Sequence, residues 1–508
     1  MNSITIGKKT MLIKREWKTA VLATWIIGLF AHAYRFFNFL MTWDSLYNIY
    51  GAGDTYGLGR WFLPWAGLIS SAFDMPWVNG ALSLFFISAA VVLLVELFEM
   101  KNGFLISLCA GVIVTFPTVM STFAYMYTAD CYMLAFLMAV AAVFVTCRVK
   151  KYGMFLGMLL LGVGMGIYQA YAATAITLVL IYIIRQFAVQ KTAFLDAVRQ
   201  DMKYLFMLVG GAAVYALFLR FSLWRYGISL AGYQGIGDMG LMSPAEYRLA
   251  LVKTKFRFSV ILGLENGIQK RPYTLLNVIL LALLAVLVIY LLIKNRVYEK
   301  KLSFAAALAG VCLLPVTCYV VNFTSPSVEY HTLMEMAVCL IYVLLILLLQ
   351  ELGGEQVFPK LLRCCGCAAL ALLVYYNVLN ANIGYFYMNQ STEKSLAIAA
   401  NVLDRVESLD EFQTATNKIA LMGTYECPTE NALSMVPSVM GISSDSFLND
   451  PNHYTILWKN YFGVQMELAS YDEINAIHET EEFQNMPIYP KKGCTRCIDG
   501  IIVVRLSE

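Results

Sequence analysis

The sequence predicts an α-helical polytopic membrane protein with about eleven transmembrane helices and a small C-terminal α/β domain outside the membrane. Two observations concern composition: the 508 residues are 59% apolar and only 14% charged, whereas soluble domains carry about 25% charge. The third is that the apolar residues fall into runs long enough to cross a bilayer. The net charge of +3 is small and dispersed along the chain, so we expect no nucleic-acid partner.

A helix needs roughly 20 apolar residues to cross the hydrocarbon core of a bilayer. The candidate spans begin near Ala20, Trp77, Phe104, Cys131, Met154, Ala170, Tyr204, Leu275, Leu302, Thr332 and Cys364. The stretch 154–184 is too long for one span and contains Gly162, Gly164 and Gly166, followed by a polar cluster around Gln169. We therefore predict two short helices that meet at a turn in this stretch.

The positions of lysine and arginine in the short loops indicate the orientation, because cytoplasmic loops are enriched in both residues. Basic residues precede the first span and occupy alternate loops: Lys8, Lys9, Lys14, Arg15 and Lys18, then Arg148, Lys150 and Lys151, then Arg185, Lys191, Arg199 and Lys203, then Lys294, Arg296, Lys300 and Lys301, then Lys360 and Arg363. The loops 126–129 and 323–330 contain none. This pattern predicts a cytoplasmic N-terminus and an external C-terminus. Alternatively, the segment ending near His32 is a cleaved signal peptide, although the apolar residues of 36–41 favour a retained span.

The composition changes near Asn389, where charged residues replace the apolar runs. We therefore divide the chain into a membrane region, 1–388, with outer loops at 43–76 and 225–273, and an extracytoplasmic soluble domain, 389–508.

Within the soluble domain we expect four elements from their hydrophobic periodicity and capping residues. They are a helix over 392–408, a strand over 418–425, a helix after Ser470 and a strand over 500–506. Cys494 and Cys497 form a C-x-x-C motif, but no second cysteine pair or histidine cluster supports zinc. A local disulfide or two free thiols are the states that we expect.

The first outer loop contains the strongest candidates for chemistry, because ionisable residues beside membrane spans are costly and usually functional. Asp44 follows the first span, and Arg60 follows a glycine-rich turn, so a carboxylate and a guanidinium can share one pocket wall. Asp130 lies at the outer end of another span. As an alternative, both acids cap helices and Arg60 pairs with either of them.

Two further outer segments contain polar candidates. Residues 244–262 mix basic and apolar side chains, as in a helix that lies in the headgroup layer; this loop either anchors the protein to lipid or helps to hold a lipid phosphate. His331 and Glu335 are spaced to share one helical face with Glu329 nearby, but two ligands do not make a metal site. We predict a hydrogen bond at a helix end there, and no metal or other cofactor has support, although a divalent metal remains open.

Four stretches resemble a known family: FNFLMTWDSL, GLGRWFLPW, TFAYMYTADCYMLAFLMAVAAVF and GIYQAYAATAI. They are similar to the polytopic Gtr-type glucosyltransferases of bacterial O-antigen and other surface polysaccharides, a branch of the GT-C superfamily. The resemblance is detailed over residues 25–184. It implies a GT-C-like membrane region in a bacterial cytoplasmic membrane, a single sugar, glucose above others, carried on undecaprenyl phosphate, and a glycan acceptor outside.

The resemblance also implies a catalytic acid in the first outer loop, which would be Asp44. Ser45 follows it where many GT-C enzymes have a second acid, so a partner acid would be Asp54 or Asp130. Because phosphate is a good leaving group, one base suffices for attack by an acceptor hydroxyl. Donor phosphate would bind Arg60, with Arg35 and Arg225 as alternatives. The candidates for substrate contact are Trp43, Tyr56, Trp61, Tyr127, Tyr168, Gln169 and His331, although an interfacial belt explains each aromatic residue alone.

Other membrane functions remain as alternatives to a transferase. A lipid-linked sugar transporter or flippase would also need many spans, but transporters commonly have internal repeats and charges near the midplane, and neither is evident in this sequence. A polysaccharide polymerase or ligase would share the topology and the lipid-linked substrates. It would move a preassembled oligosaccharide rather than one sugar.

Overall fold

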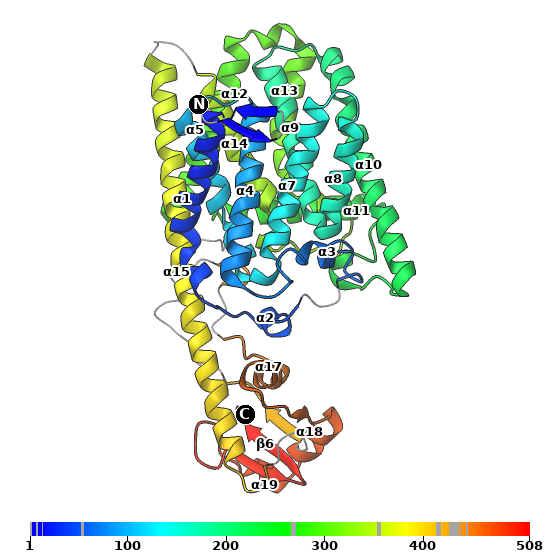
Figure 1. Cartoon of the computed structure of the whole chain (residues 1–508), viewed down its shortest axis with the longest axis vertical. Helices are drawn as coiled ribbons and strands as arrows, with labels where there is room; N and C mark the ends of the chain where they lie inside the picture. Colours follow the sequence, from blue (N-terminus) through cyan, green and yellow to red (C-terminus); the bar gives the residue numbers. More distant parts are fainter. Residues whose placement is uncertain are drawn as a thin grey trace.

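The computed structural model describes residues 3–6, 9–12, 14–51, 55–265, 271–352, 357–412, 418–425, 436, 438–442 and 446–507. Figure 1 shows a bundle of helices, from which α15 continues into a smaller unit near the C-terminus. The long elements of the bundle are α1 (Arg15–Phe37), α4 (Pro76–Leu97), α5 (Gly103–Thr115), α6 (Pro117–Ala124), α7 (Met126–Arg148), α8 (Gly153–Ile167), α9 (Ala172–Ala188), α10 (Phe194–Tyr226), α11 (Pro244–Ile261), α12 (Arg271–Lys294), α13 (Lys301–Cys318), α14 (Cys339–Gln350) and α15 (Val357–Glu407).

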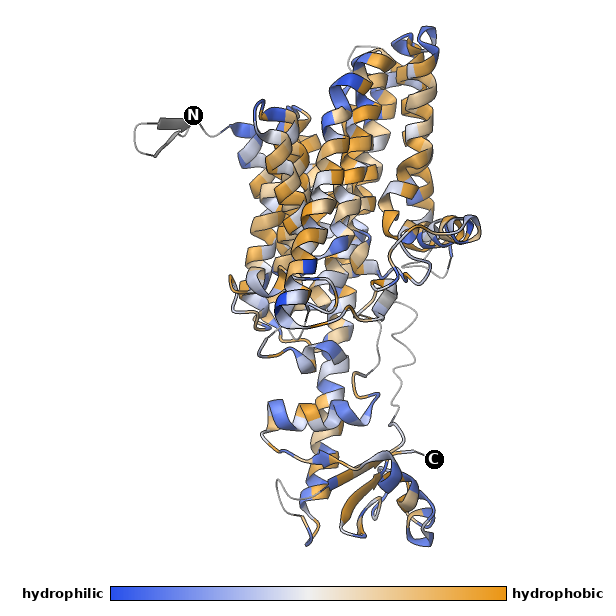
Figure 2. Cartoon of the chain, turned by 90° about the vertical axis from the view of Figure 1, so that its right-hand side faces the viewer, coloured by the Kyte–Doolittle hydropathy of each residue, from blue (hydrophilic) through white to orange (hydrophobic). Residues whose placement is uncertain are grey.

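Shorter elements connect these helices. They are the hairpin β1 (Ser3–Ile6) and β2 (Lys9–Leu12), the helices α2 (Trp43–Tyr47) and α3 (Leu63–Gly67), and 3₁₀ turns at Gln169–Tyr171, Tyr233–Gly235, Val297–Glu299, Val320–Phe323, Thr332–Met334 and Met336–Val338. Apolar residues cover most of the bundle, whereas the C-terminal unit shows both polar and apolar segments (Figure 2).

Nine helices in the described part of the chain are long and apolar enough to cross a membrane. They are Arg15–Phe37, Pro76–Leu97, Gly103–Ala124, Met126–Arg148, Gln169–Ala188, Phe194–Tyr226, Pro272–Lys294, Lys301–Cys318 and Val357–Glu407. Gly153–Ile167 and Met336–Gln350 are apolar helices of fewer residues. The predicted polytopic helical class is therefore confirmed, but only nine of the eleven predicted spans reach the length of a crossing.

The predicted break in the stretch 154–184 is present. Helix α8 ends at Ile167, Tyr168 is extended, and α9 begins after a 3₁₀ turn at Gln169–Tyr171. The glycines of α8 are places of close helix packing rather than the cause of the break, because a Cβ at Gly162 would lie 2.6 Å from Val214 of α10. Small residues let membrane helices approach closely.

The basic loops gather at the end of the bundle that carries the N-terminus. Lys14 is 2.6 Å from Glu96 at the end of α4, and Arg148 is 2.8 Å from Glu99 just after it. Lys101 of the same loop is 3.4 Å from Glu16 at the start of α1, and Lys300 Nζ donates to the Lys191 carbonyl at 2.6 Å. The C-terminal unit lies beyond the opposite end (Figure 1). The loops that we assigned to one side of the membrane are thus neighbours in the fold.

Helix α15 is longer than the sequence suggested. It has 51 residues, which corresponds to roughly 75 Å, so it extends well beyond a bilayer. We predicted a boundary near residue 388 and a separate helix over 392–408, but α15 passes through both without interruption. No proline follows Pro359 and no glycine follows Gly384 within the helix, so the local sequence permits a continuous helix.

The C-terminal unit contains a four-stranded sheet in the order β4-β3-β6-β5. Its elements are β3 (Lys418–Met422), α17 (Pro451–Leu457), a π-helical turn (Trp458–Phe462), β4 (Glu467–Leu468), α18 (Tyr471–His478), α19 (Glu481–Gln484), β5 (Thr495–Ile498) and β6 (Ile501–Arg505). Strand β3 is parallel to β4 and β6, and β5 is antiparallel to β6. The Asp499-Gly500 turn has positive φ at both residues, as two-residue hairpins require.

The two faces of this sheet are covered by different helices. One hydrophobic cluster joins α15, through Val402, to Ile502 of β6, and another joins Phe483 of α19 to Val503. The alternation of inward residues along β6 explains both contacts. Cys494 and Cys497 are both free thiols, which is one of the two states that we expected.

Candidate active site

A cavity of about 590 Å³ lies at the end of the bundle that carries α2 and α3. Segments far apart in the sequence form its wall, and the lining residues are Trp43, Asp44, Tyr47, Asn48, Thr55, Leu58, Arg60, Leu63, Tyr125, Tyr127, Thr128, Tyr132, Tyr168, Tyr233, His331, Leu333 and Met440. Its volume is typical of sites for small molecules. Among the described lining residues, Asp44 is the one carboxylate and Arg60 the one guanidinium.

Asp44 lies in the first turn of α2, with its side chain half-buried on the cavity wall. The alternative that Asp44 caps this helix is wrong, because the cap is Thr42: its Oγ1 accepts a hydrogen bond from the Ser45 backbone N–H at 3.3 Å. Burial raises the pKa of Asp44 to about 6, against the opposing effect of the positive charge of Arg60. A carboxylate with this pKa is ionised at neutral pH and is a better base than an exposed one.

Arg60 presents its guanidinium to the cavity from the loop between α2 and α3. Its Nη1 donates a hydrogen bond to the Tyr132 hydroxyl at 3.1 Å, and its guanidinium carbon is 4.7 Å from the ring centre of Tyr168. These two tyrosine rings are stacked, with centres 4.6 Å apart. The Nε atom is buried and has no hydrogen-bond partner among the described residues. A guanidinium has several N–H donors, so Arg60 retains donors for an anionic ligand.

The loop that carries Arg60 is fixed from behind by a polar network. Gln169 Nε2 donates to the Leu58 carbonyl and to the Tyr215 hydroxyl, both at 3.0 Å. The Tyr215 hydroxyl in turn donates to the Gly59 carbonyl at 3.2 Å. Gln169, which we predicted as a substrate contact, therefore holds the backbone next to Arg60. It also borders a second cavity of about 30 Å³ that Arg60 and Tyr168 share.

Gly59 is required by this network, and we expect Gly59→Ala to destabilise the protein more than Gly227→Ala. Both glycines have positive φ, which costs about 1–2 kcal/mol for a residue with a Cβ. At Gly227 a Cβ would meet nothing within 4 Å, whereas at Gly59 it would lie 2.5 Å from Gln169 Nε2. The clash should add roughly 1–3 kcal/mol to the loss of unfolding free energy. Thermal unfolding of the two purified variants measures the difference in unfolding free energy. Equal losses of unfolding free energy would show that the loop around Gly59 can shift to accommodate the Cβ at little cost.

The predicted aromatic and histidine contacts divide into two groups. Trp43, Tyr127, Tyr168 and His331 line the cavity. Burial, together with the charges of Arg257 and Arg60, lowers the pKa of His331, which keeps its imidazole neutral at neutral pH.

Two predicted contacts pack elsewhere. The Tyr56 ring is 4.4 Å from that of Tyr226. Trp61 is buried and stacks on Phe218 with ring centres 5.0 Å apart. These aromatic residues shape the outer loop, and neither lines the cavity.

The remaining charged candidates also lie away from the cavity. Asp130 is buried in α7 and its Oδ1 accepts a hydrogen bond from Asn79 Nδ2 of α4 at 3.1 Å. Arg35 is buried at the end of α1, where Nε donates to the Phe123 carbonyl at 2.8 Å and Nη2 lies 3.9 Å from Asp74. Arg225 is exposed at the end of α10. Asp54 lies outside the described residues.

Glu335 packs against α11, and its position differs from our expectation. Glu335 follows a 3₁₀ turn and is fully buried, with Oε1 at 2.8 Å from Arg257 Nη2. It therefore does not share a helical face with His331, as the spacing of an α-helix had suggested. Arg257 belongs to α11, and none of the residues of α11, all of which the structure describes, lines the cavity. No group of three His, Cys, Asp or Glu side chains with metal-site geometry occurs in the part of the chain that is described.

Sequence reasoning missed several lining residues. Tyr132 and Thr128 are one helical turn apart in α7, so their spacing could have assigned them to one face. Tyr233 lies in a long loop and Met440 in the C-terminal tail. No local pattern marks either of these two, because only tertiary contacts bring them to the cavity.

Two comparisons with known proteins bear on this chain. A search of curated proteins finds no match. The family model described as Glucosyl transferase GtrII matches residues 33–347. This match covers more than half of the chain, includes Asp44 and Arg60, and ends before α15.

Proposed function

The chain belongs to the GtrII glucosyl transferase family, and on this premise we propose that it transfers a single glucosyl unit from polyprenyl phosphate to a glycan outside a bacterial cytoplasmic membrane. The Gtr-type resemblance of the sequence is confirmed by the family match. With its apolar helices, the chain is a multi-pass membrane glycosyltransferase. The donor lipid, the acceptor and the single-sugar transfer are the parts that we propose.

The observation that carries the proposal is the pairing of Asp44 and Arg60 in one cavity. The positive charge of Arg60 lowers the pKa of Asp44, against the larger effect of burial. The two side chains nevertheless form no ion pair within 4 Å of each other. A base and an anion-binding group thus remain available on the same wall. The tyrosine-rich lining offers flat faces and hydroxyls that suit a sugar.

In the proposed reaction, Asp44 accepts the proton of an acceptor hydroxyl while the hydroxyl oxygen forms a bond to the anomeric carbon of the donor. The bond between that carbon and the phosphate oxygen breaks, and polyprenyl phosphate leaves with the electron pair. The leaving phosphate needs no proton, so the reaction does not require a second carboxyl group as the acid, in contrast to most glycoside hydrolases.

Arg60 has the complementary role. Negative charge grows on the leaving phosphate oxygen, and N–H donors that are already in place stabilise this charge without reorganisation. The Tyr132 hydroxyl and the Tyr168 ring hold the guanidinium in position. We therefore assign donor phosphate binding to Arg60 rather than to Arg35 or Arg225, neither of which lines the cavity.

We also propose that the cavity opens on the extracytoplasmic side. The basic loops near Lys14 and Lys101 lie at the opposite end of the bundle, and such loops favour the cytoplasm. A substrate that reaches the cavity would then come from the outer leaflet or from the space outside.

Transfer by the purified protein tests the proposal. The protein in lipid vesicles receives undecaprenyl-phosphate glucose with a labelled sugar, and surface polysaccharide from a strain that lacks the protein. We expect label in the polysaccharide and release of undecaprenyl phosphate only when the polysaccharide is present. Movement of uncleaved donor across the bilayer would instead show a transporter, and transfer only of preassembled oligosaccharide would show a polymerase or ligase.

A further inference from the structure

A short segment of the C-terminal tail is built into the wall of the cavity. We call residues 438–442 the wall segment. Its Met440 lines the cavity, and the Met440 carbonyl accepts a hydrogen bond from Ser121 Oγ of α6 at 2.9 Å. Val439 and Ile442 are each 1% exposed and join the hydrophobic core of the bundle. The wall segment is therefore an integral part of the bundle surface, although it comes from beyond α15 in the sequence.

Gly441 sets how closely the wall segment approaches the cavity. Its φ is +84°, and a Cβ would lie 2.6 Å from Ala124 Cβ and 2.9 Å from the Tyr125 ring. Tyr125 itself lines the cavity. Only glycine combines this backbone conformation with such an approach, so the position of Met440 depends on Gly441.

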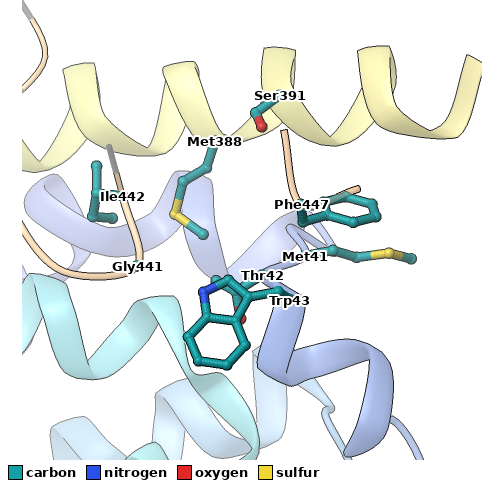
Figure 3. A pocket seen from close by; sticks show the side chains of 8 residues that line it. All are labelled: Met41, Thr42, Trp43, Met388, Ser391, Gly441, Ile442 and Phe447. Atoms are coloured by element: carbon teal, nitrogen blue, oxygen red, sulfur yellow. The ribbon is translucent and has the colours of Figure 1, made fainter. Parts of the chain in front are cut away.

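Trp43, the first residue of α2, packs beside the wall segment. Trp43, Met388 of α15, and Gly441 and Ile442 of the wall segment line one small cavity of about 10 Å³ (Figure 3). Trp43 also lines the main cavity, directly before Asp44. The tail, α15 and the start of α2 are thus packed together beside the proposed base.

Helix α17, which contains His453, and the π-helical turn after it, which contains Asn460, contact the other side of α2. His453 packs edge-on against Tyr47 with ring centres 6.0 Å apart, and Asn460 Nδ2 donates to the Leu46 carbonyl at 3.1 Å. Trp43 and Tyr47 nevertheless remain 37% and 52% exposed. Two aromatic side chains therefore stay partly exposed at the place where the tail contacts α2.

The cavity has two distinct sides. Arg60 and Tyr168 border the second, largely apolar cavity with Ile236 and Met239. Trp43, Tyr47 and Met440 do not border it, and they belong to the side where the tail packs. If donor phosphate occupies the Arg60 side, the acceptor hydroxyl must reach Asp44 from the side of the tail.

We propose that Trp43, Tyr47 and the wall segment form an acceptor subsite that binds a hexopyranose ring of the glycan, with Met440 as a specificity-determining residue. This inference rests on the proposed transferase function. Sugar rings have apolar C–H faces, which pack against aromatic and thioether surfaces. The wall segment lies outside the residues that the family model matches. The tail thus supplies Met440 to the acceptor subsite, while the matched region contains the base, the phosphate ligand and the two aromatic residues of the subsite.

The test separates acceptor binding from donor binding in the transfer reaction described above. Truncating Met440 removes apolar contact area, so Met440→Ala should raise the KM for the polysaccharide about tenfold, with a smaller change in the KM for undecaprenyl-phosphate glucose. Met440→Leu should restore most of the acceptor binding because it restores the volume. Met202→Ala is the matched control, since Met202 is an exposed methionine of α10 far along the sequence from any lining residue.

Trp43→Leu probes the same subsite from α2 rather than from the wall segment, and it replaces Met440→Ala if that variant does not fold. It should likewise raise the acceptor KM more than the donor KM. Equal changes in both KM values, or none, for folded Met440→Ala and Trp43→Leu would overturn the acceptor subsite alone. No transfer by the unmodified protein would instead overturn the proposed function.

Discussion

Replacing Asp44 by asparagine is expected to lower kcat for glucosyl transfer by about a thousandfold, because a positioned general base contributes roughly 10²–10⁴ to a rate. Asparagine keeps the size of the side chain and its place in the first turn of α2, but it cannot accept the proton of the acceptor hydroxyl. Donor binding should change little. Single-turnover transfer of labelled glucose by the purified variant gives the rate.

Two other acids provide the controls for this prediction. Asp238→Asn changes an exposed acid in the loop before α11 and should leave kcat near that of the unmodified protein. Asp130→Asn disturbs the buried hydrogen bond to Asn79, so we expect lower thermal stability rather than lower kcat per folded molecule. Near-normal turnover by Asp44→Asn, or a severe loss of kcat in folded Asp130→Asn, would show that Asp44 is not the general base.

The same role fixes the direction of the pH dependence. Burial raises the pKa of Asp44 to about 6, and the base must be ionised to act. The ionised fraction grows as the pH rises, so kcat/KM should fall about tenfold per unit below pH 6 and level off above it. Because the fall in kcat/KM below pH 6 comes from the protonation of Asp44, it should be absent from the residual activity of Asp44→Asn.

Replacing Arg60 by lysine is expected to lower kcat by about a hundredfold, the effect of losing one transition-state donor in a preorganised site. Lysine keeps the positive charge but loses the planar fork. It would also lose the paired contacts of the guanidinium with the Tyr132 hydroxyl and the Tyr168 ring. The KM for undecaprenyl-phosphate glucose should rise much less than kcat falls, which steady-state kinetics with varied donor would measure.

Arg60→Gln tests independently whether Arg60 lies close enough to Asp44 to affect its pKa. The charge of Arg60 lowers the pKa of Asp44 against the effect of burial, so its removal should move the acid limb of the pH profile to higher pH. Arg225→Gln is the matched control for Arg60→Gln, and Arg225→Lys is the matched control for Arg60→Lys, because Arg225 is exposed and does not line the cavity. An unchanged rate in Arg60→Lys, combined with a large loss in Arg225→Lys, would assign the donor phosphate to Arg225.

Local patterns were sufficient to predict several features of the bundle. Runs of apolar residues located every helix segment that became a span or a shorter apolar helix, because burial in lipid requires continuous apolar surface along a helix. The break after Ile167 was predictable from the polar residues that come after α8. In the tail, the capping sequence predicted the start of α18, where Ser470 caps the helix through a capping box with Glu473.

Local patterns were misleading where an element depends on neighbours that are distant in the sequence. The change in composition at residue 389 predicted a domain boundary, which stays a prediction, and a separate helix over 392–408, which is instead part of α15. The tail sheet packs against this same helix through residues such as Val402. The helical spacing of His331 and Glu335 was equally misleading, since 3₁₀ turns and the ion pair with Arg257 turn Glu335 toward α11.

The sequence by itself determined the class of the protein and the approximate positions of its apolar helices, and it indicated Asp44 and Arg60 as candidates, since each follows from local composition and from the cost of placing charge beside a membrane. Only the tertiary structure decided which candidates meet. In the tertiary structure, Arg35 and Asp130 are buried in contacts between helices, and Gln169 holds the loop that contains Arg60. Met440, from the C-terminal tail, lines the cavity. Long-range packing of this kind has no local signature, because the energy of each such contact depends on a residue from another part of the chain.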